Sequence, residues 1–347
     1  MASNAFSLTS SVNHLSQVVD NVNGNGMGQF FGTIFASAER VYEPAKYLAW
    51  DEITQRMNVP APFGQECGPA NKLIGAPYTI KAIPHPYINI GTDICCDGLR
   101  RVRPGPNGAP GSIQDNYLYE LDKAARYLKE SLMTRLDLMT SQQLLTGAFV
   151  VDGPTIQTQQ IDLARNPAHT VALLGPALWT AATATPLTNL DQWDALLSLN
   201  GSTSGFDVLS GANVWPILRA NDGFAKSFLS CCDKEQGNLL LNPVGGDKSS
   251  LIQQGTFRNR RLWTSNATYF DVATGTQKPL IPLDTIIMVG DVKPLVSFSA
   301  IMDLEAGYQP LEFFVKQKKD DCNGVELQSS PLALMRNING TLAAKVI

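Results

Sequence analysis

Charge is scarce in this sequence. Asp, Glu, Lys and Arg together make up 17% of its 347 residues, whereas about 25% is typical of soluble domains. The formal net charge is -4, which argues against a protein that holds nucleic acid mainly by neutralising phosphates. So few charges cannot solvate the whole surface of an extended monomer, and we therefore expect part of that surface to contact protein.

Residues that bind metals or activate nucleophiles are also few. The three histidines, His14, His85 and His169, are scattered and form no cluster with cysteines or carboxylates at ligand spacing. The cysteines include no C-x-x-C pair that would turn two sulfurs toward one ion, and we interpret them as small buried hydrophobic residues. They are Cys67, Cys95, Cys96, Cys231, Cys232 and Cys322.

Nucleotide-binding and hydrolase motifs are incomplete. The segment Gly24 to Gly28 has Gln29 where a dinucleotide fingerprint needs its third glycine. The segment Gly201 to Gly205 has Thr203 where a nucleophile elbow needs serine. No glycine-rich loop ends in Gly-Lys-Ser/Thr. We therefore expect no catalytic, cofactor-binding or metal-binding residues and no enzymatic activity.

Targeting and membrane signals are missing too. Residues 1–20 contain no basic stretch followed by an apolar run, so no secretory signal is visible. No stretch of about 18 apolar residues could cross a membrane. These absences predict a protein made in a cytoplasm, with reduced cysteines and no membrane partner.

The strongest positive pattern is a long amphipathic helix from Ser112 to about Thr146. Ser112 with Asp115 resembles a capping box, and Gly147 can close the helix. At about 1.5 Å per residue this helix is on the order of 50 Å long and needs something long to lie on. Its apolar face has three- and four-residue spacing: Leu118, Leu121, Ala125, Leu128, Leu132, Leu136 and Met139. Its polar face, expected to meet water or another subunit, carries Asp122, Lys123, Lys129, Glu130 and Arg135.

The part before this helix is predicted to be extended. Residues 1–28 are polar and rich in Gly and Asn, which indicates an arm that orders only against a partner. From Tyr47 to about Ile90, proline and glycine separate short alternating segments such as residues 78–83. A two-stranded excursion fits this pattern, and it has too few apolar residues to be stable alone. We expect it to lie on a neighbouring molecule.

The part after the helix is predicted to be mixed. Residues 149–163 read as strands, a second helix is expected around Asp191 to Leu199, and residues 212–232 are expected to be helical with Pro216 in the first turn. The apolar run Ile286 to Val289 is typical of a buried strand. The dipeptides Asn323-Gly324 and Asn339-Gly340 predict β-hairpins. The basic clusters around Arg101 and Arg260 are interpreted as ion pairs between subunits or in loops.

The order of these segments resembles the lambda-type major capsid proteins of tailed bacteriophages, the phage major capsid protein E family. The residues that carry this resemblance run in order along the chain: Phe30-Phe31, residues 39–42, residues 75–77, the long helix with residues 147–153, residues 161–163, Trp179, residues 282–284 and residues 328–332.

The resemblance implies an α+β fold, the Hong Kong 97 (HK97) capsid fold. It also implies the following parts: an N-terminal arm (1–40), an extended loop (41–92), a peripheral domain with the long spine helix (93–172, helix 112–146), an axial α/β domain (173–300) and further peripheral strands (301–347). The axial domain would meet its copies around five-fold and six-fold positions.

The function that the resemblance implies is structural. Many copies would assemble as hexamers and pentamers into the icosahedral head shell of a tailed phage, which encloses double-stranded DNA without reading its sequence. The implied location is the virion capsid, after assembly in the host cytoplasm. Because the chain has no long charged N-terminal segment, the resemblance implies a separate scaffolding protein or assembly without one. It also implies a portal as a partner and leaves open whether a decoration protein binds.

Two alternatives stay open on the sequence. The same fold builds encapsulin compartments, whose shells hold enzymes instead of DNA. A β-rich hydrolase or carbohydrate-binding protein would need a secretion signal or a convergent acid/base pair, and neither is visible in the sequence.

Overall fold

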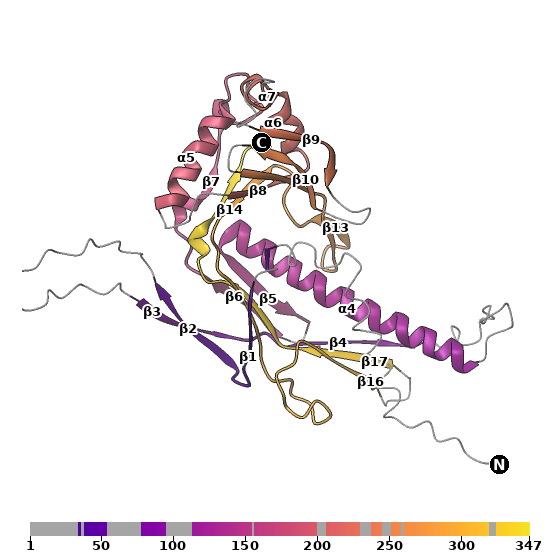
Figure 1. The fold of residues 1–347 in the computed structure, drawn as a ribbon. Coiled ribbons are helices and arrows are strands. Elements are labelled where there is room, and N and C mark those ends of the chain that lie inside the picture. The colour runs from indigo at the N-terminus through magenta and orange to yellow at the C-terminus, as the bar shows by residue number, and fades with distance from the viewer. Residues whose placement is uncertain are drawn as a thin grey trace, which may run out of the picture.

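The computed structural model is an elongated α+β molecule (Figure 1). It describes the residue ranges 34–35, 38–53, 78–94, 113–154, 156–199, 206–229, 237–244, 251–257, 260–318 and 324–347. The expected N-terminal arm up to residue 33, the two glycine motifs, all cysteines, the cap at Ser112 and the proline-rich residues 54–77 lie outside these ranges.

The long helix is present as α4 (Ile113–Thr146), which has 34 residues. Its predicted apolar face is confirmed from Leu121 onward, because Leu121, Ala125, Leu128, Leu132, Leu136 and Met139 are all buried, while Leu118 is half-buried. Gly147 ends the helix with φ of 75°, and its N–H donates to the carbonyl of Gln143 at 2.8 Å. A Cβ at this position would come within 2.5 Å of Arg165 Cβ, so both the backbone angle and the space require glycine.

Two different sheets cover the two halves of this face. Near the N-terminal half lie β4 (Ile88–Asp93), β16 (Phe314–Lys318) and β17 (Gly324–Ser329), in the order β16-β17-β4. Near the C-terminal half lie β1 (Glu39–Tyr42), β15 (Pro294–Phe298) and β18 (Pro331–Met335), in the order β1-β15-β18. Buried Gln143 joins α4 to β18, since its side chain donates to Ala333 O at 2.7 Å and accepts from Met335 N at 3.2 Å. Strands from before and after the helix in the sequence thus supply the long support that its length requires.

Beyond the C-terminal end of α4 stands a compact α/β module. Among the described strands its sheet has the order β7-β19-β14-β8-β11-β10-β9. The bounds are β7 (Thr170–Ala172), β8 (Phe206–Gly211), β9 (Gly237–Val244), β10 (Leu251–Phe257), β11 (Arg260–Ser265), β14 (Thr285–Val289) and β19 (Thr341–Lys345). The helices α5 (Pro186–Leu199), α6 (Val214–Ala220) and α7 (Asp222–Leu229) pack on it through a core that includes Leu190, Trp193, Phe224 and Ile286.

Ion pairs inside this module account for the basic cluster near Arg260. The Arg260 guanidinium, 3% exposed, lies against Asp191 at 2.6 Å and against Asp194, both on α5. Arg261 pairs with Asp207 of the adjacent strand β8 at 2.6 Å. These two arginines thus tie neighbouring elements of one chain, whereas an ion pair between subunits or in a loop was expected.

The remaining strands form hairpins. β5 (Ala148–Gly153) and β6 (Ile156–Asp162) follow α4 as an antiparallel pair. β12 (Thr268–Asp271) and β13 (Thr276–Pro279) pair across a turn at Gly275, whose φ is 65°. β2 (Tyr47–Ile53) and β3 (Tyr78–Pro84) pair over their whole lengths. β16 and β17 are also antiparallel partners, as the Asn323-Gly324 signal predicted.

The hairpin predicted at Asn339-Gly340 is wrong. β18 before it pairs with β15, whereas β19 after it pairs with β14 and β7 in the other sheet. Ile338 is buried in the core between the two sheets, and the Asn337 side chain donates to Asp291 O at 2.7 Å. The segment is therefore a crossing between sheets, fixed by tertiary contacts that override the local turn signal.

Two helix boundaries also differ from the prediction. α5 begins at Pro186 rather than near Asp191, because the fixed φ of proline suits the first helical turn. The helical stretch expected over residues 212–232 is two helices, α6 and α7, which separate at Asn221. The Asn221 side chain accepts from Phe224 N at 3.2 Å and so caps the second helix.

Two strands connect parts of the chain that are far apart in sequence. β4, which lies almost wholly inside the range 41–92 that the resemblance assigns to the extended loop, is hydrogen-bonded to β17 under α4. β19 falls inside 301–347, yet it lies between β14 and β7 in the module's sheet. Each of these two strands therefore pairs with a strand that is far from it in the sequence.

Both histidines of the described chain are buried. His169 is 0% exposed and its Nδ1 contacts Thr341 O at 2.9 Å. His85 is 7% exposed and lies between Lys46 O and Ser297 Oγ. Burial lowers the pKa of each imidazole below its ordinary value, and the nearby Arg165 lowers that of His169 further.

We predict that acid weakens the fold through these histidines. The unfolded chain binds a proton near its ordinary pKa of about 6.5, while the folded chain resists protonation, so the free energy of unfolding falls as the pH drops below that value and is unaffected above it. Urea unfolding at a series of pH values should show this slope. His169→Asn should lower stability overall but flatten the slope between pH 7 and 5; an equally steep slope in this variant would contradict the assignment.

A second prediction tests the packing of α4. Leu128→Ala should lower the free energy of unfolding by about 2–5 kcal/mol, because Leu128 is 2% exposed and its removal leaves a cavity against β17. The neighbouring Tyr127→Ala is the control, since Tyr127 is 61% exposed and should change stability by about 0.5 kcal/mol or less. Equal losses in urea unfolding for the two variants would disprove the packing described here.

Candidate assembly surfaces

Within the described ranges, no group of three or more His, Cys, Asp or Glu residues could hold a metal ion. None of the described helices has the length and apolar character that a membrane crossing requires. The features that stand out are large hydrophobic side chains on the surface. They gather near the β2–β3 hairpin (Tyr42, Tyr47, Tyr87), on the loop after β15 (Met302, Leu304, Tyr308) and on the α/β module (Leu174, Leu199, Phe270, Val272, Leu283).

The β2–β3 hairpin extends sideways from the body (Figure 1). Seven register pairs join its strands, from Tyr47 with Pro84 to Ile53 with Tyr78. At its base, Leu48 and Ile83 are buried in the core, while the next pair, Ala49 and Ala82, is already exposed. Because an isolated two-stranded hairpin is marginally stable in water, this projection is suited to lie on another molecule.

The base of this hairpin is held firmly. The His85 backbone N–H donates to Lys46 O at 3.0 Å, and its ring nitrogens lie 3.2 Å from Lys46 O and 2.9 Å from Ser297 Oγ. The Ser299 hydroxyl donates to Ala45 O at 3.0 Å. These bonds connect both hairpin strands to β15 and its end, so the direction of the hairpin is set by the body.

The second surface is the 299–313 loop, which connects β15 to β16. It lies on the side of the strands away from α4 (Figure 1). Ile301 is fully buried, and its N–H donates to Gln309 O at 3.1 Å, which closes the loop. Gly307 and Tyr308 take positive φ angles of 67° and 52° at the turn. Met302 and Leu304 are 72% and 81% exposed.

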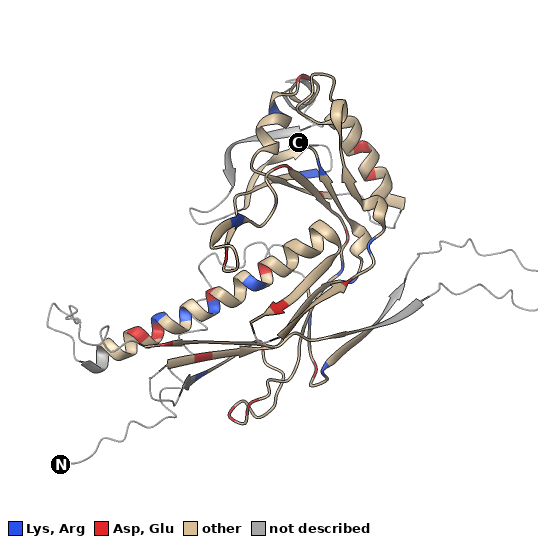
Figure 2. Cartoon of the chain, turned by 180° about the vertical axis from the view of Figure 1, so that it is seen from behind, with Lys and Arg blue, Asp and Glu red and all other residues tan. Residues whose placement is uncertain are grey.

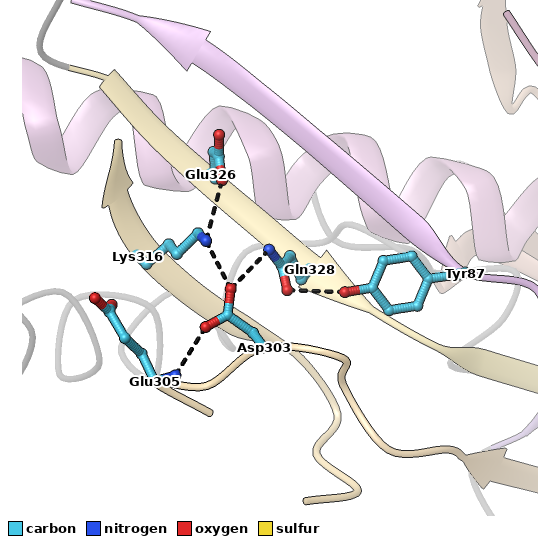
Figure 3. Close-up of polar contacts among 6 residues, drawn as sticks. All are labelled: Tyr87, Asp303, Glu305, Lys316, Glu326 and Gln328. Carbon is cyan, nitrogen blue, oxygen red and sulfur yellow. Dashed lines mark hydrogen bonds and ion pairs between the residues drawn. The ribbon is translucent and has the colours of Figure 1, made fainter. Parts of the chain in front are cut away.

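A polar cluster under the loop fixes this arrangement (Figure 3). Asp303 Oδ2 accepts from Lys316 Nζ at 2.6 Å and from Gln328 Nε2 at 3.3 Å, and Asp303 Oδ1 accepts from Glu305 N at 2.8 Å. Lys316 also lies 3.5 Å from Glu326. Gln328 in turn accepts from Tyr87 OH at 2.8 Å. We call this set the Asp303 cluster: Tyr87, Asp303, Lys316, Glu326 and Gln328.

The electrostatics of the Asp303 cluster keep it charged. The hydrogen bond from Lys316 lowers the pKa of Asp303, and the same bond raises the pKa of Lys316. Burial raises the pKa of Tyr87, which therefore stays a neutral donor. At neutral pH the ionised carboxylate points inward, and the two apolar residues beside it point outward. On most protein surfaces charged groups face the solvent and apolar groups face inward. Here the arrangement is reversed, and the contacts of Asp303 hold the exposed apolar side chains in place.

The far end of the loop holds β1. The Glu312 carboxylate pairs with Arg40 and accepts from Tyr42 OH at 2.8 Å. Burial, and then the hydrogen bond to Glu312, raises the pKa of Tyr42. Arg336 also pairs with Glu39 at 2.9 Å. The segment that follows the expected N-terminal arm is thus bound to the same loop and strands.

α4 carries charges of both signs along its length (Figure 2). Asp122 pairs with Arg126 at 3.0 Å, and Arg135 pairs with Asp152 at 2.8 Å. Lys129, expected on this polar face, is instead 7% exposed, with Nζ 5.2 Å from the centre of the Phe313 ring. A cation–π contact and the long methylene stem allow its burial. The charged face is therefore narrower than predicted.

The sequence pointed to the extended loop as a contact region but missed the 299–313 loop. The available signal was an apolar-acidic-apolar triplet, Met302-Asp303-Leu304, in a segment with turn residues. Periodicity could not assign it, because which side chains turn outward depends on partners far away in sequence, Lys316 and Gln328.

Comparison with known proteins supports a capsid assignment. The family model described as "Phage major capsid protein E" matches residues 8–346. The crystal structure of a protein assigned as the capsid protein of a prophage in E. coli CFT073 superposes with a TM-score of 0.68 at 16% identity, covering 97% of this chain and 99% of that chain. Among curated proteins, no sequence matches.

Weaker likeness is found to two shells. For the mature capsid of bacteriophage PhiM1 the TM-score is 0.49 at 11% identity, over 89% of this chain and 84% of that chain. For the SrpI encapsulin complex of Synechococcus elongatus PCC 7942 it is 0.47 at 11% identity, over 91% and 87%. The assignment depends on the family match and on the prophage structure, which gives the fold as HK97-like. The chain belongs to the phage major capsid protein E family and is a shell-forming capsid protein of the virion.

Proposed function

We propose that many copies of this chain close into the icosahedral head shell of a tailed phage, as hexamers and pentamers around a double-stranded DNA genome. The observation that supports this most directly is the separation of rigidly held contact surfaces: the β2–β3 hairpin extends to one side and the 299–313 loop lies on another. Each surface engages a different neighbour. In a closed symmetric shell, individually modest contacts add up to a stable particle.

The parts of the chain have separate roles in this proposal. The hairpin with residues 54–77 laps over an adjacent copy, and residues 1–33 form an arm that binds a neighbour. α4 with the sheets beneath it is the peripheral domain. The α/β module, which holds most of residues 173 to 300 together with β7 and β19 but without β15, is the axial domain around the five-fold and six-fold positions.

The chemistry of the chain suits a container. A net charge of -4 gives little general attraction for DNA phosphates, so the genome is enclosed without being bound by sequence. Assembly takes place in the host cytoplasm. A separate scaffolding protein, a portal and a decoration protein are the expected partners.

An encapsulin-like compartment shell is the second candidate function for this fold. It has less support, because the matching family is one of phage capsids. A hydrolase or carbohydrate-binding role has less support again, because the family model that matches residues 8–346 is one of phage capsids. The two shell readings differ in their contents: a phage shell fills with DNA in the presence of its packaging proteins, and an encapsulin fills with an enzyme.

The first test is electron microscopy of the expressed full chain, together with light scattering. Hollow particles are expected, alone or with phage partners present. Leu304→Glu should remove most particles, since a charge at an 81% exposed apolar contact must be desolvated when the neighbour binds. Its melting temperature should stay within about 2 °C of the unchanged chain.

Leu304→Met is the matched control and should assemble normally. Exclusively monomeric protein from the unchanged chain, even with its partners, would refute the shell proposal itself. Normal assembly of Leu304→Glu would refute only the role of the loop.

A second test addresses the Asp303 cluster. Asp303→Asn removes the carboxylate that accepts from Lys316 and should lower stability by about 1 kcal/mol, while loosening the loop. Hydrogen exchange should become several-fold faster at the Glu305 amide, which donates to the Asp303 carboxylate, and at the Tyr308 amide, which donates to the backbone carbonyl of Asp303. The fully buried strand β14 is the internal control and should keep its rate. Unchanged exchange in the loop would rule out the cluster as its support.

A further inference from the structure

The strand β6 has an open edge. In the described chain it pairs with β5 alone. Its residues 156–160 are all exposed, and only Ile161 is buried. An exposed strand edge presents a row of backbone donors and acceptors that can pair with another strand.

The hydrogen-bonding pattern shows which backbone groups face outward. Leu163 N donates to Gly147 O at 3.0 Å. Hydrogen-bonded pairs alternate with non-hydrogen-bonded pairs along an antiparallel ladder. The next hydrogen-bonded pairs are therefore Phe149 with Ile161 and Val151 with Gln159. Val150 and Gln160 then form a non-hydrogen-bonded pair, so the backbone groups of Gln160 point away from β5. The register shifts between Val151 and Gly153, so this alternation ends at Gln159.

The opposite edge of the same ribbon is already satisfied. Val150 N donates to Gln142 Oε1 at 3.0 Å, and Arg135 donates to Asp152 O at 2.9 Å. Side chains of α4 therefore occupy the outer edge of β5. The contrast between the two edges makes β6 the side of this ribbon that is available for pairing.

β6 has only some of the features that natural proteins use to protect an edge: its pairing with β5 is irregular between Val151 and Gly153, and the strand ends in the charged Asp162. Residues 156–161 read IQTQQI, without a charge, a proline or a glycine. Charged residues and proline are the usual guards against edge-to-edge pairing. In a shell built of many copies, the uncharged residues 156–161 of two subunits can lie side by side without like-charge repulsion.

We infer that β6 pairs antiparallel with β6 of a second copy across a two-fold axis of the shell. In the register centred on Gln159, Gln160 of each copy faces Thr158 of the other, and the outward N–H and C=O groups of Gln160 are directed at the second copy. Glutamine and threonine side chains then lie against one another, and the contact is self-complementary, as a two-fold interface requires. This inference rests on the proposed shell function, and it adds a specific contact to it.

Cysteine cross-linking tests the register. Gln159 faces itself in a non-hydrogen-bonded pair, where Cα atoms are about 4.5 Å apart, within the range that a disulfide spans. Gln159→Cys should give disulfide-linked dimers after mild oxidation. Gln157→Cys is the control, because in this register Gln157 faces Ile161 and lies too far from its own copy. Dimers through residue 157 but not 159, or through neither, would overturn the proposed pairing.

Backbone chemistry tests the hydrogen bonds. Gln160→Pro removes an outward N–H from each copy and should lower the yield of particles by roughly tenfold or more, while the folded subunit persists, since proline is tolerated on an edge strand. Gln160→Ala keeps the N–H and should assemble normally. Normal assembly of the proline variant would refute the pairing and leave the shell proposal intact.

If the unchanged chain forms no particles, the shell proposal fails. The cysteine experiment on concentrated protein then still decides whether β6 pairs with itself: a dimer specific to residue 159 supports the pairing, and its absence overturns it.

Discussion

The structure depends on covering one apolar face that is far longer than any single sheet in the chain. α4 has 34 residues, about 50 Å at 1.5 Å per residue, while a strand of six residues spans only about 20 Å. No one local segment can cover it. Strands from distant parts of the sequence therefore converge beneath the helix: β4 and β17 at one end, β15 and β18 at the other. The elongated shape follows from this requirement.

An elongated molecule has consequences for its surface. Its polar side chains are too few to cover the exposed area, and several are used internally, as Lys129, Gln143 and Arg165 are. Arg165 donates to the last carbonyls of α4, and burial lowers its pKa to about 10. Apolar groups such as Leu304 are left outside. For a monomer this would be a liability, whereas in the proposed shell the same groups supply the contacts between copies.

The sequence allowed the helices and strands with a periodic pattern to be predicted, but not how these elements connect and pack. The spine, the buried strand at residues 286–289 and the paired strands after the helix follow from local patterns. The crossing at Asn339-Gly340 does not, because the turn signal is the same whether the next strand returns to its neighbour or enters another sheet. For a related reason, Lys129 was expected on the polar face and the 299–313 loop was missed. The direction of the Lys129 side chain depends on Phe313, and that of the loop side chains depends on Lys316, which lies outside the loop.

The rigidity of the contact surfaces bears on how a shell can assemble without aggregating. A flexible apolar loop would contact many surfaces and lose conformational entropy at each of them. The Asp303 cluster and the His85 contacts fix the loop and the hairpin base before any neighbour arrives, so less entropy is lost on binding and fewer wrong contacts fit. The fixed geometry also sets the angle between neighbours, and in a closed shell that angle must be nearly the same at every copy. Polar groups buried inside the subunit thus serve specificity, while the apolar groups they orient supply affinity.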